Sequence, residues 1–153
     1  MMIKKILWIE DKAEKDIHQN IERWCKKQSI ELIKVDDLGD FAEELESIKS
    51  SDNEMITGFI IDLLLSGTSN LSDFGIKYEW NHIQEDGGLI LIQKVLRSND
   101  FNYQDIPILV LSVRANKIPE LEQYQKLEVI QKRDYLNNNW EGDIEKWLKG
   151  IKN

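Results

Sequence analysis

The sequence contains only one cysteine, Cys25, among its 153 residues. A single cysteine excludes an intrachain disulfide and a zinc site built from several thiolates, and it is compatible with a reducing compartment. Cys25 follows Trp24 in a segment whose apolar residues have helical spacing. This setting favours a buried structural thiol over a reactive one.

The sequence also lacks a long apolar run and a block of basic residues. The apolar start is interrupted by Glu10 and Asp11, which leaves it too short for a signal peptide, and no run approaches the roughly 18 apolar residues of a transmembrane helix. We therefore expect a cytoplasmic protein without membrane insertion. With 20 Lys and Arg against 28 Asp and Glu, the net charge is −8. Because phosphate backbones attract clustered basic side chains, direct nucleic-acid binding is not expected.

What remains is the composition of an ordinary folded domain, 41% hydrophobic and 31% charged. The length suits one domain with its own core. We expect a single domain over residues 1–153 with an extended loop at about 66–86. Because the sequence ends soon after its last helical pattern, no output domain is expected.

Short apolar segments alternate with helical patterns along the whole sequence. The expected strands are residues 6–9, 30–35, 56–61, 106–111 and 127–130. Helical spacing of apolar residues covers about 17–24, 41–48, 89–96, 116–124 and 144–151. Asp40 and Glu43 predict a capping box for the second helix, and Asn116 is the expected cap of the fourth, with Pro119 in its first turn.

This alternation predicts an α/β fold made of βαβ units. Right-handed crossovers place helices on both faces of a parallel sheet. We therefore expect a flavodoxin-like, doubly wound, five-stranded parallel sheet in the order 2-1-3-4-5.

Polar residues follow four of the five expected strands. Glu10 and Asp11 come after the first strand, Asp62 after the third, Ser112 after the fourth and Lys132 after the fifth. The carboxyl ends of parallel strands meet at one edge of the sheet, where ligand sites form. Clustered carboxylates suit a hard cation such as Mg²⁺, and a carboxylate can also act as a nucleophile toward a phosphoryl group. The hydroxyl and the ammonium can then contact phosphoryl oxygens.

Five segments, in this order, resemble the receiver domain of two-component response regulators: "ILWIEDK", "FIIDLLLSG", "GGLILIQKVLR", "IPILVLS" and "VIQK". The resemblance covers nearly the whole chain. It implies that Asp62 is the phosphoacceptor, and that Ser112 and Lys132 are the switch serine and the site lysine. It also implies a Mg²⁺ site formed by Glu10, Asp11, Asp62 and the backbone carbonyl of Leu64.

The resemblance further implies partners and a mode of action. The phosphoryl donor would be a phosphohistidine on a sensor histidine kinase or a phosphotransfer protein. The output would be contact with a downstream protein whose identity the sequence does not give. The chain would carry out only its own phosphorylation and dephosphorylation, and would not be an enzyme acting on other substrates.

The sequence departs from the family pattern at several positions. Arg133 follows Lys132 where the family often has proline, Val129 stands where a switch aromatic is expected, and Val113 replaces a small residue. Ser66-Gly67 stands in place of Pro-Gly. Residues 66–86 replace a short turn, and this long loop is either a surface excursion or a lid or docking element.

Two functional interpretations therefore stay open. The first is a stand-alone receiver that is phosphorylated on Asp62 in a Mg²⁺-dependent phosphorelay. The second is a receiver-like protein-binding module that works without phosphorylation, which Val113, Val129, Arg133 and the long loop at 66–86 favour. A phosphatase with an aspartate nucleophile is disfavoured, since such enzymes commonly carry a second acid where Leu64 stands.

Overall fold

The structure is a computed structural model that describes residues 1–10, 14–65, 74–75, 87–113, 118–134 and 136–151. The strands are β1 (Ile3–Ile9), β2 (Ile30–Val35), β3 (Glu54–Ile61), β4 (Ile108–Ser112) and β5 (Leu127–Gln131). The helices are α1 (Lys15–Lys27), α2 (Leu38–Lys49), α3 (Gly87–Leu91), the π-helix η3 (Ile92–Leu96), the 3-10 helix η4 (Pro119–Leu121) and α4 (Trp140–Gly150). The predicted loop at 66–86 lies outside the described residues, apart from 74–75.

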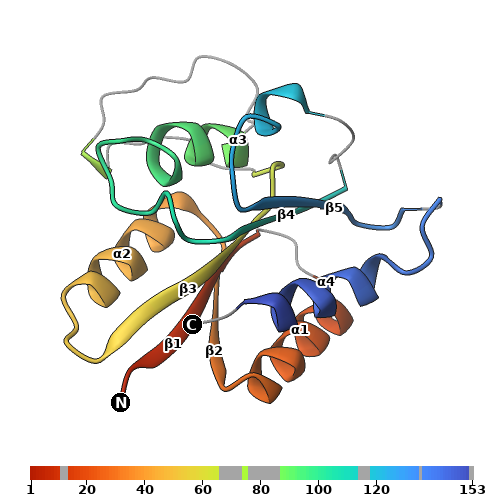
Figure 1. The fold of residues 1–153 in the computed structure, drawn as a ribbon, viewed down its shortest axis with the longest axis horizontal. Coiled ribbons are helices and arrows are strands. Elements are labelled where there is room, and N and C mark those ends of the chain that lie inside the picture. The colour runs from red at the N-terminus through yellow and green to blue at the C-terminus, as the bar shows by residue number, and fades with distance from the viewer. Residues whose placement is uncertain (11–13, 66–73, 76–86, 114–117, 135, 152–153) are drawn as a thin grey trace.

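The five strands form one parallel sheet in the order β2-β1-β3-β4-β5 (Figure 1). The predicted flavodoxin-like fold is confirmed. Helices α1 and α4 cover one face, and α2 with α3 covers the other. Among the described helices, none is both long and apolar enough to span a membrane.

The central strands are buried on both faces, as expected for a parallel sheet covered by helices. In β1, Leu7 and Ile9 pack in the core beneath α2 and α3, whereas Ile6 and Trp8 pack beneath α1 and α4. All four side chains are fully buried. The near-continuous apolar runs in the sequence reflect this burial on two sides.

The second helix begins earlier than predicted. Asp37 is its N-cap, and Asp37 Oδ1 accepts a hydrogen bond from the Asp40 backbone N–H at 2.8 Å. The predicted cap at Asp40 is wrong because Leu38 is buried against the core, which extends the helix by three residues.

The predicted fourth helix is also wrong in its described part. Residues 118–124 form only tight turns, in which Leu121, Glu122 and Tyr124 donate backbone hydrogen bonds to residues three positions earlier. Pro119 has no N–H to continue a longer helix, and Lys126 has a positive φ of 55° directly before β5. Asn116, the expected cap, lies outside the described residues.

Phe74 belongs to the long predicted loop and is one of its two described residues. Its ring packs against Phe41 of α2 with a centroid separation of 6.3 Å. It also contacts the core beneath α2 and α3. This part of the loop is therefore attached to the α2 side of the sheet.

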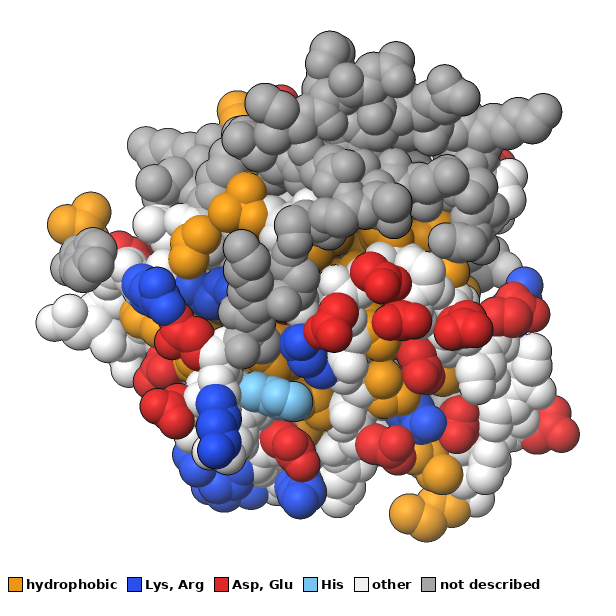
Figure 2. Space-filling model, turned by 180° about the vertical axis from the view of Figure 1, so that it is seen from behind, with side chains coloured by type: hydrophobic (Ala, Val, Ile, Leu, Met, Phe, Trp, Pro, Cys, Tyr) orange, Lys and Arg blue, Asp and Glu red, His pale blue; other side chains and the backbone are white. Residues whose placement is uncertain are grey.

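Figure 2 shows the side of the molecule behind Figure 1. Acidic side chains gather at one side of this view and are interspersed with basic ones. The coloured side chains form no broad basic patch on this face.

The amino ends of three strands are joined by a buried cation. Lys5 of β1 donates to Glu54 of β3 at 2.9 Å and lies 3.7 Å from Glu31 of β2. Lys5 is only 8% exposed. Because β1 lies between the strands that carry the two acids, this cation bridges both neighbours of β1.

Arg97 holds the segment that leads into β4 and β5. The π-helix η3 ends with a backbone hydrogen bond from Arg97 N–H to the carbonyl of Ile92 at 2.8 Å, five residues earlier. The Arg97 guanidinium donates to five carbonyls, those of Leu96, Tyr103, Ile106, Gln125 and Lys126. Burial lowers the pKa of Arg97, but a guanidinium remains protonated in proteins. One side chain thus ties together two chain segments distant in sequence.

Replacing Arg97 should destabilise the protein strongly. We expect Arg97→Ala to lower the free energy of unfolding by about 3 kcal/mol, since it leaves several carbonyls without their charged donor. Arg97→Lys should lose most of the same stability, because one ammonium does not match the planar fork. Urea denaturation measures both values, with Lys149→Ala as a surface control expected to change stability by less than about 0.5 kcal/mol. Wild-type stability in both Arg97 variants would contradict this role.

Cys25 lies on the buried side of α1, as the sequence predicted, and burial raises the pKa of its thiol to about 12. We expect Cys25 in the native protein to react with Ellman's reagent at least about 100-fold more slowly than in concentrated urea, because the thiolate is the reactive form. Ser50→Cys, at the exposed end of α2, should add one fast-reacting thiol. Rapid reaction of the wild-type native protein would disprove the assignment.

Candidate functional site

The carboxyl ends of four strands bring predicted site residues to one edge of the sheet. Glu10 follows β1, Asp62 follows β3, Ser112 ends β4 and Lys132 lies just beyond β5. Sheet hydrogen bonds continue into these positions, from Asp62 N–H to the Ile9 carbonyl at 3.1 Å and from Lys132 N–H to the Ser112 carbonyl at 2.9 Å. Strand pairing therefore fixes the backbone positions of these residues.

Glu10, Asp62 and Lys132 form a buried ion-paired group, here called the Asp62 cluster. The Lys132 ammonium pairs with the Glu10 carboxylate, and Lys132 Nζ lies 3.8 Å from Asp62 Oδ2. Glu10 is fully buried and Asp62 is 5% exposed. Burying two carboxylates is costly unless they are compensated, and Lys132 supplies one positive charge between them.

The Glu10 carboxylate has few partners for a fully buried acid. Apart from Lys132, no group in the described ranges donates a hydrogen bond to either of its oxygens. A fully buried carboxylate with only one charged partner is an unusual arrangement in a native protein. It provides lone pairs that a cation would satisfy.

Asp62 is oriented by the turn that follows β3. The Leu64 backbone N–H donates to Asp62 Oδ1 at 3.1 Å. Asp62 also lies beside Lys132 through its other oxygen, Oδ2. The two oxygens of this carboxylate therefore have different partners and a defined orientation.

The donor set fits a hard divalent cation. Glu10 and Asp62 offer carboxylate oxygens, and Leu64 offers a backbone carbonyl on the same segment as Asp62. Oxygen ligands of these kinds suit Mg²⁺ or Mn²⁺. Asp11, the third predicted carboxylate, lies outside the described residues. In the part of the chain that the structure describes, no group of three or more His, Cys, Asp or Glu side chains is arranged to hold a metal.

Lys132 is the only cation that the structure places in the Asp62 cluster among the described residues. Burial lowers the pKa of Lys132 to about 8. At that value the amine is still protonated at neutral pH. It can therefore act as a fixed positive charge beside Asp62.

Ser112 is fully buried at the end of β4. Its backbone carbonyl accepts from Lys132 N–H, so the two residues are adjacent across the β4–β5 pair. The structure thus brings Glu10, Asp62, Ser112 and Lys132 to one edge, as predicted. Their chemical roles stay predictions.

The positions that depart from the family pattern have distinct environments. Arg133 has a positive φ of 56°, and its guanidinium pairs with Glu14 before α1. Val113 is 45% exposed and Val129 is 41% exposed. The segment after β5 is thus tied to the start of α1, and two valines at this end of the sheet face solvent.

Sequence reasoning missed the importance of two glycines beside Asp62. The predicted third helix began at about residue 89, but Gly87 and Gly88 are both buried in its first turn. The Gly88 N–H donates to the Leu63 carbonyl at 3.2 Å. The adjacent glycines in the sequence were the available signal, since glycine often marks a close backbone approach.

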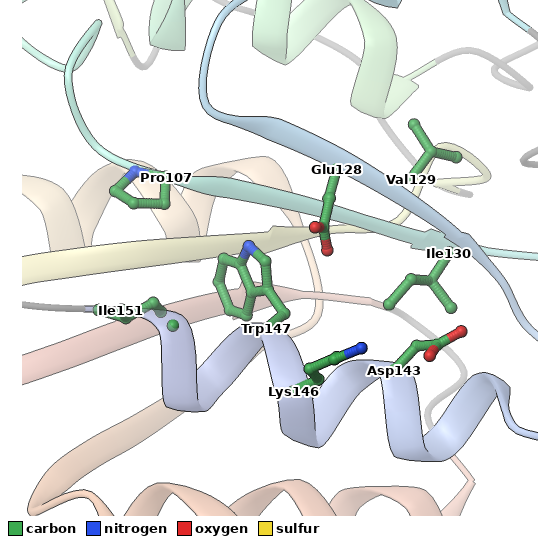
Figure 3. A pocket seen from close by; sticks show the side chains of 9 residues that line it. Pro107, Glu128, Val129, Ile130, Asp143, Lys146, Trp147 and Ile151 are labelled. Carbon is green, nitrogen blue, oxygen red and sulfur yellow. The ribbon is translucent and has the colours of Figure 1, made fainter.

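Two cavities lined by described residues lie away from the Asp62 cluster. One of about 500 Å³ is formed between β5 and α4, where Trp147 points toward the sheet between Pro107 and Glu128 (Figure 3). Another of about 300 Å³ lies between α2, β3 and residues 101–106. Neither cavity is lined by Glu10, Asp62 or Lys132.

The comparisons with known proteins concern the fold. The response regulator Rcp1, solved in its Mn²⁺-bound form, has a TM-score of 0.60 and 19% identity, with 97% of each chain covered. A de novo designed Rossmann 2x3 protein has a TM-score of 0.49, and the signal receiver domain of a protein named as a LuxO repressor from Vibrio parahaemolyticus has 0.45. Both are 15% identical, with 97% of this chain and 92% of theirs covered.

The sequence matches no protein-family model, and no curated protein matches it significantly. The likeness to Rcp1 extends over nearly all of both chains and includes the five-stranded order described above. The chain therefore has the receiver fold of response regulators.

Proposed function

We propose that this chain is a response regulator receiver that accepts a phosphoryl group on Asp62 with the help of a divalent cation. The observation that carries the proposal is the Asp62 cluster, in which Lys132 lies between the Glu10 and Asp62 carboxylates at the carboxyl edge of a receiver fold. Burial of two acids at this edge is costly, and a role in binding and phosphoryl transfer gives a reason for that cost.

The chemistry follows from the positions of these side chains. An oxygen of Asp62 attacks the phosphorus of a phosphohistidine, so that a P–O bond forms, the P–N bond breaks and the imidazole nitrogen leaves. The Lys132 ammonium, 3.8 Å from Asp62 Oδ2, is placed to pair with a phosphoryl oxygen on that carboxylate. Ser112 at the end of β4 is the proposed donor to a second phosphoryl oxygen.

Glu10, Asp62, the Leu64 carbonyl and Asp11 would hold Mg²⁺ at this edge. When bound, Mg²⁺ would neutralise charge on the carboxylates and the phosphoryl oxygens. The bound metal of Rcp1 belongs to that protein. For this chain, support comes from the buried Glu10 carboxylate, which has no hydrogen-bond donor other than Lys132 among the described residues.

The proposed partners follow from this chemistry. The donor is a sensor histidine kinase or phosphotransfer protein in the cytoplasm, and the chain acts on no other substrate. Phosphorylation would change a protein-binding surface near Ser112 and the segment after it. Val113 and Val129 are the exposed large apolar side chains closest in sequence to Ser112 and Lys132 among the described residues.

A second candidate is a receiver-like binding module that works without phosphorylation. The observations that favour it are the short η4 helix, where the receiver family carries a longer helix, and the exposed Val129, where the family carries a switch aromatic. In this reading the Lys132 ion pair is a permanent part of the structure. The two candidates differ in whether Asp62 is needed.

Phosphorylation of Asp62 can be tested directly. Incubation with Mg²⁺ and acetyl phosphate should add one phosphoryl mass to the wild-type chain, and Asp62→Asn should abolish the adduct because it lacks the nucleophilic carboxylate. Asp36→Asn is the matched control, since Asp36 follows β2 but is exposed, and it should retain the adduct. Intact mass spectrometry provides the readout. An adduct that persists in Asp62→Asn, or none in the wild type, would favour the binding module.

The Lys132 ion pair can be tested through stability. We expect Lys132→Ala to lower the free energy of unfolding by about 3 kcal/mol without metal, because two buried carboxylates lose their counter-ion. Millimolar Mg²⁺ should recover part of this loss if the carboxylates bind it. Urea denaturation with and without Mg²⁺ gives the values. The control variant Lys149→Ala, which removes an exposed ion pair with Glu145, should have nearly wild-type stability, and Mg²⁺ should not alter it. A Lys132→Ala variant as stable as wild type would contradict the compensating role.

A further inference from the structure

Helix α3 begins in direct contact with the backbone of Asp62. The Gly88 N–H donates to the Leu63 carbonyl at 3.2 Å. A Cβ atom at position 88 would lie 2.1 Å from the Asp62 carbonyl oxygen and 2.8 Å from both the Asp62 carbonyl carbon and the Leu63 Cα. Real Cβ contacts essentially never fall below 3.0 Å, so only glycine fits against this peptide.

The neighbouring glycine has a different environment. A Cβ at Gly87 would meet the side chain of Leu65, 2.9 Å from its Cβ and 3.4 Å from its Cγ and Cδ1. A Cβ at Gly150, at the end of α4, would have no atom within 4 Å. Of these three glycines, only Gly88 lies where an added Cβ would clash with backbone atoms. The nearest of those atoms is the carbonyl oxygen of Asp62, the proposed phosphoacceptor.

This backbone carries the chemistry of the proposed site. Asp62 is held from one side by its N–H bond to the Ile9 carbonyl, while Gly88 contacts its carbonyl. The same short segment bears the Asp62 carboxylate and, two residues on, the Leu64 carbonyl. To relieve a clash at position 88, the Asp62 peptide or helix α3 would have to move by roughly 1 Å. A displacement of this size at a reacting group is enough to slow a reaction substantially.

Glycine weakens a helix relative to alanine, and this makes its presence in the first turn informative. If helix formation alone mattered, alanine at position 88 would be the better residue. The close approach to Asp62 provides the physical reason for glycine. That approach lets α3 fix the depth at which the Asp62 peptide lies at the edge of the sheet.

We propose that Gly88 is a positioning residue, which sets the location of the Asp62 carboxylate and the Leu64 carbonyl through backbone contact. The proposal rests on the proposed function of Asp62 as phosphoacceptor. It predicts that a methyl group at position 88, which would lie 2.1 Å from the Asp62 carbonyl oxygen, displaces the Asp62 peptide. A methyl group at position 87, which would lie 2.9 Å from the Leu65 Cβ, requires a shift of only about 0.1 Å.

Gly88→Ala and Gly87→Ala form the matched pair for the test. We expect Gly88→Ala to slow formation of the acetyl phosphate adduct about 10- to 100-fold, and Gly87→Ala to slow it less than about 3-fold. The rate is measured by intact mass at saturating Mg²⁺, and urea denaturation of both variants separates a loss of site geometry from a loss of fold. Equal rates for Gly88→Ala and wild type would overturn the proposal.

A metal-free measurement separates this proposal from the proposed function. The Asp62 carboxyl ¹³C resonance should move in Gly88→Ala and remain close to wild type in Gly87→Ala, whether or not Asp62 is ever phosphorylated. A wild-type protein without an adduct would refute the proposed function, and this resonance would still decide the role of Gly88. If the Asp62 carboxyl resonance in Gly88→Ala stays at its wild-type position, the positioning role of Gly88 is overturned.

If Gly88→Ala does not fold, the wild-type chain still provides a test. Its Gly88 amide resonance should shift when Mg²⁺ is added, because the acceptor carbonyl of Leu63 immediately precedes Leu64, whereas the Gly150 amide should not shift. A Gly88 resonance that stays fixed while Asp62 and Leu64 respond would count against positioning through this contact.

Discussion

The candidate site at the carboxyl edge of the sheet depends on one ion-paired group, in which the Lys132 ammonium lies between the buried carboxylates of Glu10 and Asp62. These acids follow neighbouring strands, so the sheet cannot bring β1 and β3 together without also bringing their carboxylates together. Like charges at such a distance repel, and burial removes the water that would screen them. Lys132 follows β5, the edge strand on the opposite side of the sheet from β2, and its positive charge offsets part of that cost.

Several backbone contacts maintain this geometry. Strand pairing holds Asp62 and Lys132 through hydrogen bonds from their own N–H groups. Helix α3 approaches the Asp62 peptide closely at Gly88. The π-helix η3 follows α3 and places Arg97 where it donates to the carbonyls of Ile106, before β4, and Lys126, before β5. The helix that contacts Asp62 thus leads directly into the side chain that holds the next two strands.

Sequence reasoning succeeded where a short local pattern carries the information. The strand that ends before Asp62 was recognised from an unbroken apolar run, and burial of β3 on two faces explains why that run is unbroken. Reasoning failed where tertiary contacts outweigh local preference. Burial of Leu38 moved the helix start from Asp40 to Asp37, and the turns before β5 left only three helical residues after Ile118. Local signals at Asp40 and Pro119 were compatible with either outcome.

The sequence by itself determined the alternation of strands and helices and the polar residues at the strand ends, because these depend on periodicity and on general rules of connection. Only the tertiary structure decided that Lys132 pairs with Glu10 as well as facing Asp62, that Arg133 reaches Glu14, and that Gly88 touches the Asp62 peptide. These contacts join residues far apart in the chain. Their distances depend on how deeply each helix packs on the sheet, and no local pattern of residues encodes that depth.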